Sequence, residues 1–141
     1  MLLNDRQLEA TEKKIADINQ AIKKQTAELK ALRYDSESIK RGMAPFKCIK
    51  KECQEEIRRY LRLKNKGISA LPKTIELQGL GKMLVEARIA KGLDQMEFAK
   101  MAGVKVTQVH RDEVNCYYGI AIPRANRILE LLGLTVKMKI S

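Results

Sequence analysis

The chain has no tryptophan among its 141 residues, and phenylalanine and tyrosine together make up only 4% of it. Cysteine and histidine are also scarce: the thiols are Cys48, Cys53 and Cys116, and the one imidazole is His110. These residues are too few and too scattered for a disulfide framework, and no Cys-x-x-Cys pair offers the spacing of a zinc site. We therefore expect free thiols in a reducing, cytoplasmic environment, with no metal and no cofactor.

Long hydrophobic runs are missing as well. No stretch approaches the roughly 18–20 consecutive apolar residues of a membrane-spanning helix, and the polar residues from Asn4 onward do not fit a signal peptide. The chain also lacks paired carboxylates, a metal-binding cluster and a phosphate-binding glycine loop. His110 has no nucleophile at a recognisable spacing. We expect neither a membrane partner nor an enzyme.

Positive charge is what the chain has in excess. Lysine and arginine number 28 against 17 aspartates and glutamates, which gives a formal net charge of +11. Such a balance suits a polyanionic partner, most often nucleic acid. The excess is spread over both parts of the chain, with 17 basic and 10 acidic residues in 1–66 and 11 basic and 7 acidic residues in 67–141. One basic cluster closes the first part, where it either contacts phosphate or forms a solvated helix face: Arg58, Arg59, Arg62, Lys64 and Lys66.

The N-terminal part has the pattern of long helices. Residues 5–39 contain no proline or glycine, and a stripe with alternating spacings of three and four forms an a/d heptad seam: Leu8, Thr11, Ile15, Ile18, Ile22, Gln25, Leu29 and Leu32. Gly42 and Pro45 are expected to end this helix and to start a second one over 45–64. The two helices fold back as an antiparallel hairpin, or residues 8–32 form a parallel coiled-coil dimer. Both arrangements use the same stripe.

Three domain segments follow from the composition. Residues 64–74 carry Gly67, Ser69 and Pro72 with little periodicity, which indicates a linker. We expect a helical hairpin or coiled coil over 1–66, a linker over 67–76 and a second domain over 77–141.

Residues 80–115 have the pattern of a helix-turn-helix. The first helix is expected over 75–90, with Leu80, Leu84, Ala87 and Ile89 facing inward, and Gly92 ends it. Asp94 is then placed to cap the next helix, and Glu97 three residues later completes a capping box. Phe98 and Met101 are expected to pack inward, Gly103 takes the turn with a positive φ, and Val104 and Val109 are inward residues of the segment that follows. In this motif the second helix can lie in the DNA major groove.

The stretch ARIAKGLDQMEFAKMAGVKVTQVHRDE resembles the Cro/repressor-like helix-turn-helix family of the xenobiotic-response-element (XRE) type, and the match runs from Leu80 to Gly133. It depends on a combination of positions: Arg88, Gly92-Leu93, Gln95 after an N-cap, Phe98-Ala99, Gly103-Val104, Val109, Arg111 and Glu113. The resemblance implies a five-helix-type, lambda-repressor-like domain. With the long helical extension and Tyr117-Tyr118, the layout is similar to the antitoxin-like regulators of this family, which commonly repress their own operon and neutralise a co-encoded toxin.

The resemblance also assigns roles by position. Gln95 would bond a phosphate at the start of its helix, and Arg111 would contact a guanine through two hydrogen bonds. The remaining expected DNA-contacting residues are Lys105, Val106, Thr107, Gln108 and His110. Arg88 and Glu113 match an ion pair that joins the first and third helices of the family. The chain departs from the pattern at Val106, where the family usually has a polar base-contacting residue, and at Asp112, where it usually has an apolar or aromatic one.

The C-terminal part is expected to add a helix and a strand. Pro123 suits the first turn of a helix, and Ile128, Leu131 and Leu132 give that helix an apolar face before Gly133 stops it. Residues 135–140 alternate apolar and polar residues as a strand does. An isolated strand needs the same strand of a second subunit, so we expect a twofold homodimer.

The sequence thus predicts an all-α protein with a short C-terminal dimerising strand. The function we predict is that of a sequence-specific transcriptional repressor, the antitoxin and autoregulator of a toxin–antitoxin operon. Its partners would be a palindromic operator in double-stranded DNA, a second copy of itself and a cognate toxin. The alternative is a protein-interaction scaffold, or an antitoxin, whose helix-turn-helix fold no longer binds specific DNA.

Overall fold

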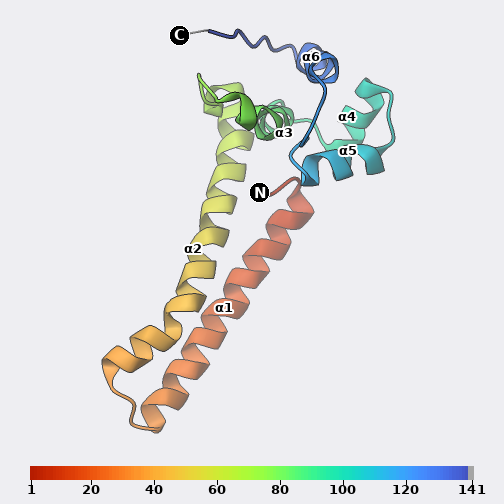
Figure 1. The fold of residues 1–141 in the computed structure, drawn as a ribbon. Helices are drawn as coiled ribbons and strands as arrows, with labels where there is room; N and C mark the ends of the chain where they lie inside the picture. Colours follow the sequence, from red (N-terminus) through yellow and green to blue (C-terminus); the bar gives the residue numbers. More distant parts are fainter. Residues whose placement is uncertain (140–141) are drawn as a thin grey trace. The chain divides into compact units, whose positions relative to one another are not determined.

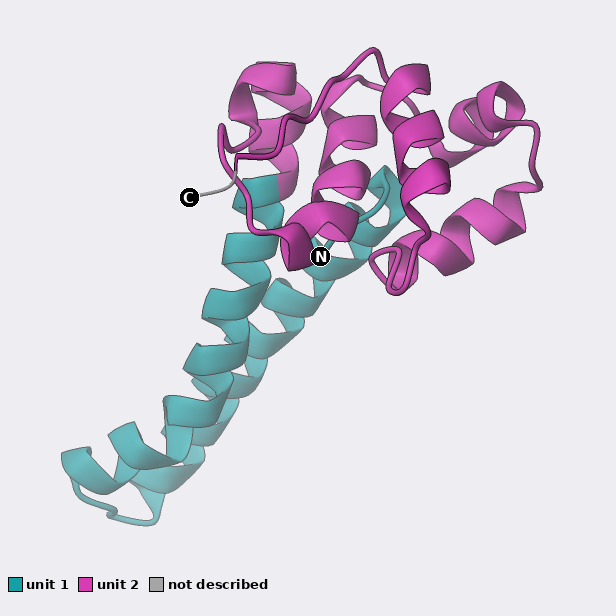
Figure 2. Ribbon diagram, turned by 45° about the horizontal axis from the view of Figure 1, so that its top comes forward, with its two compact units in different colours: residues 1–59 teal, residues 60–141 magenta. Residues whose placement is uncertain are grey.

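The structure is a computed structural model that describes residues 1–139 of the chain. Over these residues it contains six α-helices, two short 3-10 turns and no β-strand (Figure 1). The expected all-α class is confirmed. The chain divides into two compact units, residues 1–59 and residues 60–141, which Figure 2 colours separately. Each unit is described by itself below.

Helix α1 (Asp5–Ala31) opens unit 1, and its start is fixed by a reciprocal cap. The side-chain Oδ1 of Asn4 accepts a hydrogen bond from the backbone N–H of Gln7 at 2.9 Å, and the Gln7 side chain accepts one from the backbone of Leu3 at 2.8 Å. This satisfies N–H groups that have no partner inside the helix. No residue of α1 is fully buried, so the seam residues Leu8, Ile15 and Leu29 are only half-buried.

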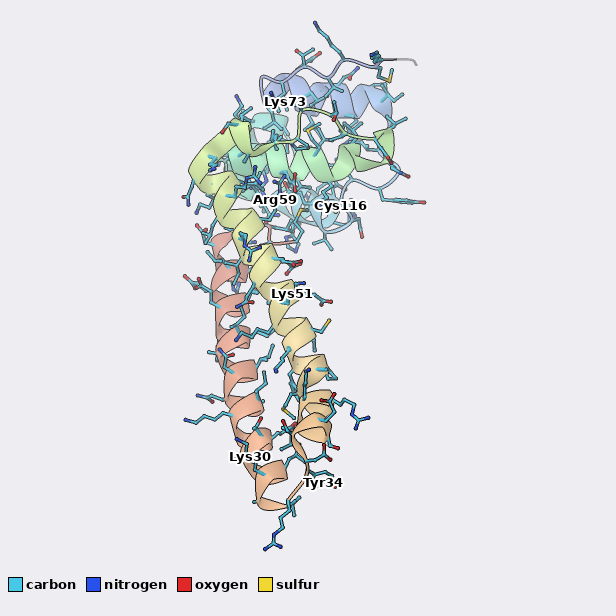
Figure 3. All side chains as sticks on the ribbon, turned by 90° about the vertical axis from the view of Figure 1, so that its left-hand side faces the viewer. Lys30, Tyr34, Lys51, Arg59, Lys73 and Cys116 are labelled. Atoms are coloured by element: carbon cyan, nitrogen blue, oxygen red, sulfur yellow. The ribbon has the colours of Figure 1, made fainter. Side chains whose placement is uncertain are left out.

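The end of α1 corrects the prediction of one helix over residues 5–39. The chain turns after Ala31 because Arg33 adopts a left-handed conformation with φ of 61°, a backbone geometry that the helical pattern does not reveal. Tyr34 lies in this turn (Figure 3). Asp35 then precedes α2 (Ser36–Lys66): its Oδ1 accepts from the backbone N–H of Ser38 at 2.9 Å, and the Ser38 hydroxyl donates to Oδ2 at 2.7 Å. These bonds lower the pKa of Asp35, the Ser38 hydroxyl contributing most.

The predicted break at Gly42 and Pro45 is also wrong, because both residues lie inside α2. Pro45 removes one helical hydrogen bond, and a proline inside a helix bends it rather than ending it when the flanking turns are held. Figure 1 draws the first turns of α2 at an angle to the rest of the helix. Gly42 faces α1: a Cβ built on it would lie 3.8 Å from Cδ1 of Leu29.

Within unit 1, α1 and α2 form an antiparallel hairpin. The two helices lie side by side in Figures 1 and 2. Contacts at both ends agree with this: Leu29 meets Gly42 near the turn, and the backbone nitrogen of Met1 lies 2.5 Å from Oε1 of Glu56. A single chain therefore forms the hairpin, one of the two arrangements expected from the heptad seam.

Unit 2 begins with the last turns of α2 and contains the remaining elements: η1 (Gly67–Ala70), η2 (Leu77–Gly79), α3 (Leu80–Ala90), α4 (Gln95–Ala102), α5 (Val106–Val114) and α6 (Ile122–Leu131). Helix α3 is the centre of this unit, since it contacts η1, η2, α5 and α6, and all its residues except Leu80 and Lys82 are buried. Helices α4 and α5 pack on each other. The expected linker is partly ordered, because η1 buries Ala70.

Most of the expected inward residues of unit 2 are buried, including Leu84, Phe98 and Val109. Leu80, Val104 and Leu131 are half-buried, and Met101 departs furthest from the expectation, with 45% of its surface exposed. The inward stripe of α4 follows positions 95, 98, 99 and 102, and a helical turn of about 100° per residue places position 101 on its flank. Here Ala99 and Ala102 occupy the inward positions in place of Met101.

The C-terminal segment forms no hydrogen-bonded strand within residues 135–139, and Ile140 lies outside the described residues. Val136 and Met138 are exposed there. The predicted strand needs a second chain as its partner, so it stays a prediction.

Candidate nucleic-acid interface

Helix α4 starts at a complete capping box, as the sequence predicts. The Asp94 side chain accepts from the backbone N–H of Glu97 at 2.7 Å, and the Glu97 side chain accepts from the backbone N–H of Asp94 at 2.8 Å. The reciprocal bonds fix the point where the chain leaves α3 and enters α4.

The turn between α4 and α5 has three residues, 103–105. Gly103 closes α4 in the left-handed conformation, with φ of 68° and ψ of 32°. Val104 then donates its backbone N–H to the carbonyl of Ala99 at 3.0 Å, and Lys105 is extended before α5 begins. Among the described residues nothing lies within 4 Å of a Cβ built on Gly103, so the positive φ and not lack of space favours glycine here.

A buried ion pair joins α3 to α5, as the resemblance implies. Arg88 Nε lies 2.5 Å from Glu113 Oε1, and Arg88 Nη2 lies 2.8 Å from Oε2. The two side chains are only 3% and 0% exposed. The remaining Arg88 nitrogen, Nη1, donates to the carbonyl of Leu93 at 2.6 Å. Because one planar guanidinium holds both carboxylate oxygens of Glu113 and a loop carbonyl, the orientation of α5 on α3 is closely defined.

Gln95 belongs to this buried network. Its Nε2 donates to Glu113 Oε2 at 2.7 Å, and its Oε1 lies 3.3 Å from His110 Nδ1. The side chain that was expected to bond a phosphate therefore donates one of its two amide N–H groups to Glu113, and the phosphate contact stays a prediction. The sequence pattern gave no sign of the internal role, since the partners are 15 and 18 residues away.

One face of α5 is open to solvent. Val109 and Glu113 are buried on the inner side. The outer side presents most of the residues expected to contact DNA: Lys105, Val106, Thr107, His110 and Arg111 are all exposed, and Gln108 is half-buried on the flank. Thr107, His110 and Arg111 are three or four residues apart and therefore share a face of α5, and Val114, which is 57% exposed, extends this face by one turn. Sequence reasoning did not include Val114.

The negative charge of Asp112, one of the two departures from the family pattern, has a partner on α6. The Asp112 carboxylate, placed beside Arg111 in the sequence, forms an ion pair with Arg124 whose nearest atoms, Oδ2 and Nη2, are 2.5 Å apart. The backbone carbonyl of Asp112 also accepts a hydrogen bond from the backbone N–H of Tyr117 at 2.7 Å. Arg124 compensates the negative charge of Asp112. Arg111 itself is exposed and forms no ion pair with any of residues 1–139.

The segment after α5 is tightly held against α3. Cys116, Tyr117 and Gly119 all have positive φ. A Cβ on Gly81 of α3 would lie 1.9 Å from the carbonyl oxygen of Cys116, so the two backbones are in direct contact. Tyr117 is buried in this segment, and burial, followed by the carboxylates of Glu113 and Asp112, raises the pKa of its hydroxyl.

Other kinds of site find no support in the part of the chain that the structure describes. No group of histidine, cysteine and carboxylate side chains within residues 1–139 is arranged to hold a metal ion. The thiols of Cys48, Cys53 and Cys116 are free. None of the helices in these residues has the length and apolar character required to cross a membrane.

Comparison of the chain with protein-family models, with curated proteins and with solved structures found no match. The case for its function therefore depends on its own geometry.

Proposed function

We propose that the protein is a sequence-specific DNA-binding regulator of the XRE type, in which α4, the turn 103–105 and α5 form a helix-turn-helix. The observation that carries the proposal is the outer face of α5: a basic and polar surface on a helix whose inner face is fixed to α3 by the pair Arg88–Glu113. A rigid scaffold with an exposed helix is what recognition of base edges needs.

The dimensions of α5 suit the DNA major groove. An α-helix with its side chains is about 10–12 Å across, and the major groove of B-DNA, about 12 Å wide, admits it. The nine residues of α5, at about 1.5 Å each, would extend about 14 Å along the groove. Arg111 would donate two hydrogen bonds to O6 and N7 of a guanine, and Val106 and Thr107 would meet base edges or a thymine methyl group. Lys105 at the start of the helix suits a phosphate.

Repression would follow from occupancy of a promoter by a dimer. A twofold dimer presents two copies of α5 to a palindromic operator, at half-sites about 34 Å apart. Residues 135–140, whose apolar side chains Val136 and Met138 are exposed, would pair with the same segment of a second copy. The more specific proposal, an antitoxin that also binds a cognate toxin, depends on the resemblance alone.

The experiment is a binding titration by fluorescence anisotropy with duplexes selected from a random pool, at one fixed salt concentration. Arg111→Ala is expected to weaken binding to the selected site by about 1–3 kcal/mol and to relax the preference at one base pair. Arg6→Ala, a loss of an exposed arginine in α1, is the matched control and leaves the preference unchanged. A wild-type protein without site preference, together with an Arg111→Ala variant that binds equally well, would end this proposal.

The second candidate is a protein-interaction scaffold that keeps the fold without binding specific DNA. It is favoured by exposed apolar side chains, since Val106 and Val114 are exposed on α5 and Met96 is exposed on α4. In that case Val114→Lys would abolish capture of a protein partner, and no duplex would be enriched in the selection.

A further inference from the structure

Helix α2 carries a line of basic side chains along one side. Lys40, Lys47, Lys51 and Arg58 follow one another at intervals of seven, four and seven residues. At about 100° per residue these spacings bring Lys47, Lys51 and Arg58, which follow Pro45, within about 40° of one another around the helix axis, and Lys40 continues the line before the bend at Pro45. Each of the four is exposed, and none forms an ion pair or a side-chain hydrogen bond with the described residues. All four belong to unit 1, and Figure 3 labels Lys51 on α2.

The neighbouring helix shows that this charge is a property of α2. Residues of α1 include six lysines and arginines against five acidic residues, whereas α2 has ten against four. Between the four cations, Ala44 and Gln54 occupy the same side of α2, and Glu55 borders it. The line is therefore almost free of opposing charge, and it extends over 18 residues, or about 27 Å measured along the path of the helix.

The chemistry of the line favours one class of partner. A protein partner is normally bound through a buried apolar or aromatic centre, and the line has none, since Ile49 lies on the opposite side of α2. A membrane-bound helix needs a broad apolar face that is open to its surroundings. The apolar side of α2 instead faces α1 within the hairpin. A nucleic-acid duplex needs only cations spaced along a rod, because it carries about one negative charge per 1.7 Å of its axis.

We infer that the outward side of α2 is a sequence-independent phosphate-binding surface for duplex DNA, formed by Lys40, Lys47, Lys51 and Arg58. The inference rests on the proposed function only in the choice of DNA as the physiological polyanion. It assigns affinity to the hairpin and leaves base recognition to α5. Phosphate contacts position a protein and contribute salt-dependent affinity without sequence information.

The test compares two full-length variants that each lose four positive charges. The first is K40Q/K47Q/K51Q/R58Q. The control is K13Q/K14Q/K23Q/K24Q, which removes four exposed lysines of α1. Affinity for a random-sequence duplex is measured between about 50 and 200 mM salt, where each phosphate contact contributes about 0.9 to the slope of log K against log salt. The α2 variant is expected to lose about 3 from that slope, and the control less than 1.

Further measurements make the outcome decisive. Equal helicity by circular dichroism shows that both variants fold, and the charge-conserving variant K40R/K47R/K51R/R58K is expected to retain the slope. Equal losses in the two neutralised variants would overturn the inference, since net charge alone would then explain them. The inference would also be overturned if the α2 variant lost binding to phosphatidylserine vesicles or to a polyglutamate peptide while its slope of log K against log salt for duplex DNA stayed unchanged. Arg111→Ala tests α5 separately, because the inference predicts that it changes site preference and leaves the slope for random duplex nearly intact.

Discussion

The guanidinium of Arg88 and the carboxylate of Glu113 form a two-bond ion pair in the interior of unit 2, with contacts of 2.5 and 2.8 Å. Arg88 comes from α3 and Glu113 from α5, 25 residues later. Gln95 and the carbonyl of Leu93 complete the hydrogen bonding of the pair. No described buried side-chain nitrogen or oxygen lacks a partner. One network thus ties the helix with the exposed basic face to the core.

Breaking this pair is expected to be costly. Glu113→Ala leaves the Arg88 charge buried without its counter-ion, which typically lowers the free energy of unfolding by about 3–5 kcal/mol. Urea denaturation followed by circular dichroism measures the change. Glu130→Ala, which removes an exposed carboxylate of α6, is the control and is expected to change stability by less than about 0.5 kcal/mol. Similar stabilities for the two variants would contradict the network described above.

Gly81→Ala tests the contact between α3 and the segment after α5. The added methyl group would lie 1.9 Å from the Cys116 oxygen and 2.9 Å from the Cys116 carbonyl carbon, and both are backbone atoms that cannot rotate away. We expect a loss of stability of about 1–3 kcal/mol or more. Gly79→Ala is the matched control, because its Cβ would have an ordinary contact of 3.9 Å with Ile75. Thermal unfolding of both variants decides, and an unaffected melting temperature for Gly81→Ala would refute the close approach.

The raised pKa of Tyr117 predicts a loss of stability in alkaline solution. Its pKa in the folded protein is raised above the ordinary value of 10.0, first by burial and then by Glu113 and Asp112. Below pH 10 the hydroxyl is neutral in both states and its contribution to stability is fully present. Above pH 10 the unfolded chain loses the proton while the folded chain keeps it, so the free energy of unfolding falls by up to about 1.4 kcal/mol per pH unit.

Two tyrosine variants isolate this effect from the titration of lysines. Tyr117→Phe is expected to show a flatter decline of stability above about pH 10. Tyr118→Phe, at a neighbouring residue that is 96% exposed, is expected to follow the wild type. The measurement is urea denaturation at a series of pH values, and parallel curves for Tyr117→Phe and wild type would refute the assignment.

The cap of α4 gives a smaller, local prediction. Asp94→Ala removes the acceptor for the Glu97 N–H and is expected to lower the free energy of unfolding by about 1 kcal/mol. Asp94→Asn keeps an acceptor oxygen at the same place and is expected to stay within a few tenths of a kcal/mol of wild type. Equal losses for both substitutions would show that the charge of Asp94, and not its hydrogen bond, is what matters.

Features set by neighbours in the sequence were predictable. The capping box at Asp94 and Glu97 and the positive φ of Gly103 depend on chemistry within three or four residues, and the structure contains both. The pair Arg88–Glu113 spans a longer distance, and it was expected from a family pattern rather than from local rules. The exposed face of α5 followed from helical periodicity once Val109 was assigned to the core.

Features set by tertiary packing were not predictable. The turn after α1 depends on a left-handed conformation of Arg33, and the residue types at this turn do not indicate that conformation. Helix α2 continues through Pro45 as one helix. Gln95 bonds to Glu113 and Asp112 pairs with Arg124 because the packing of α4, α5 and α6 brings distant residues together. Local periodicity contains no information on such pairs.

The approach of Gly81 to the carbonyl of Cys116 has a consequence for the recognition of relatives. Any other chain with this arrangement must have hydrogen as its side chain at the corresponding place, or must route the segment between its last two helices differently. Glycine at that position is therefore a structural criterion for assigning diverged sequences to the same fold, and it applies whether or not they keep the exposed residues of α5.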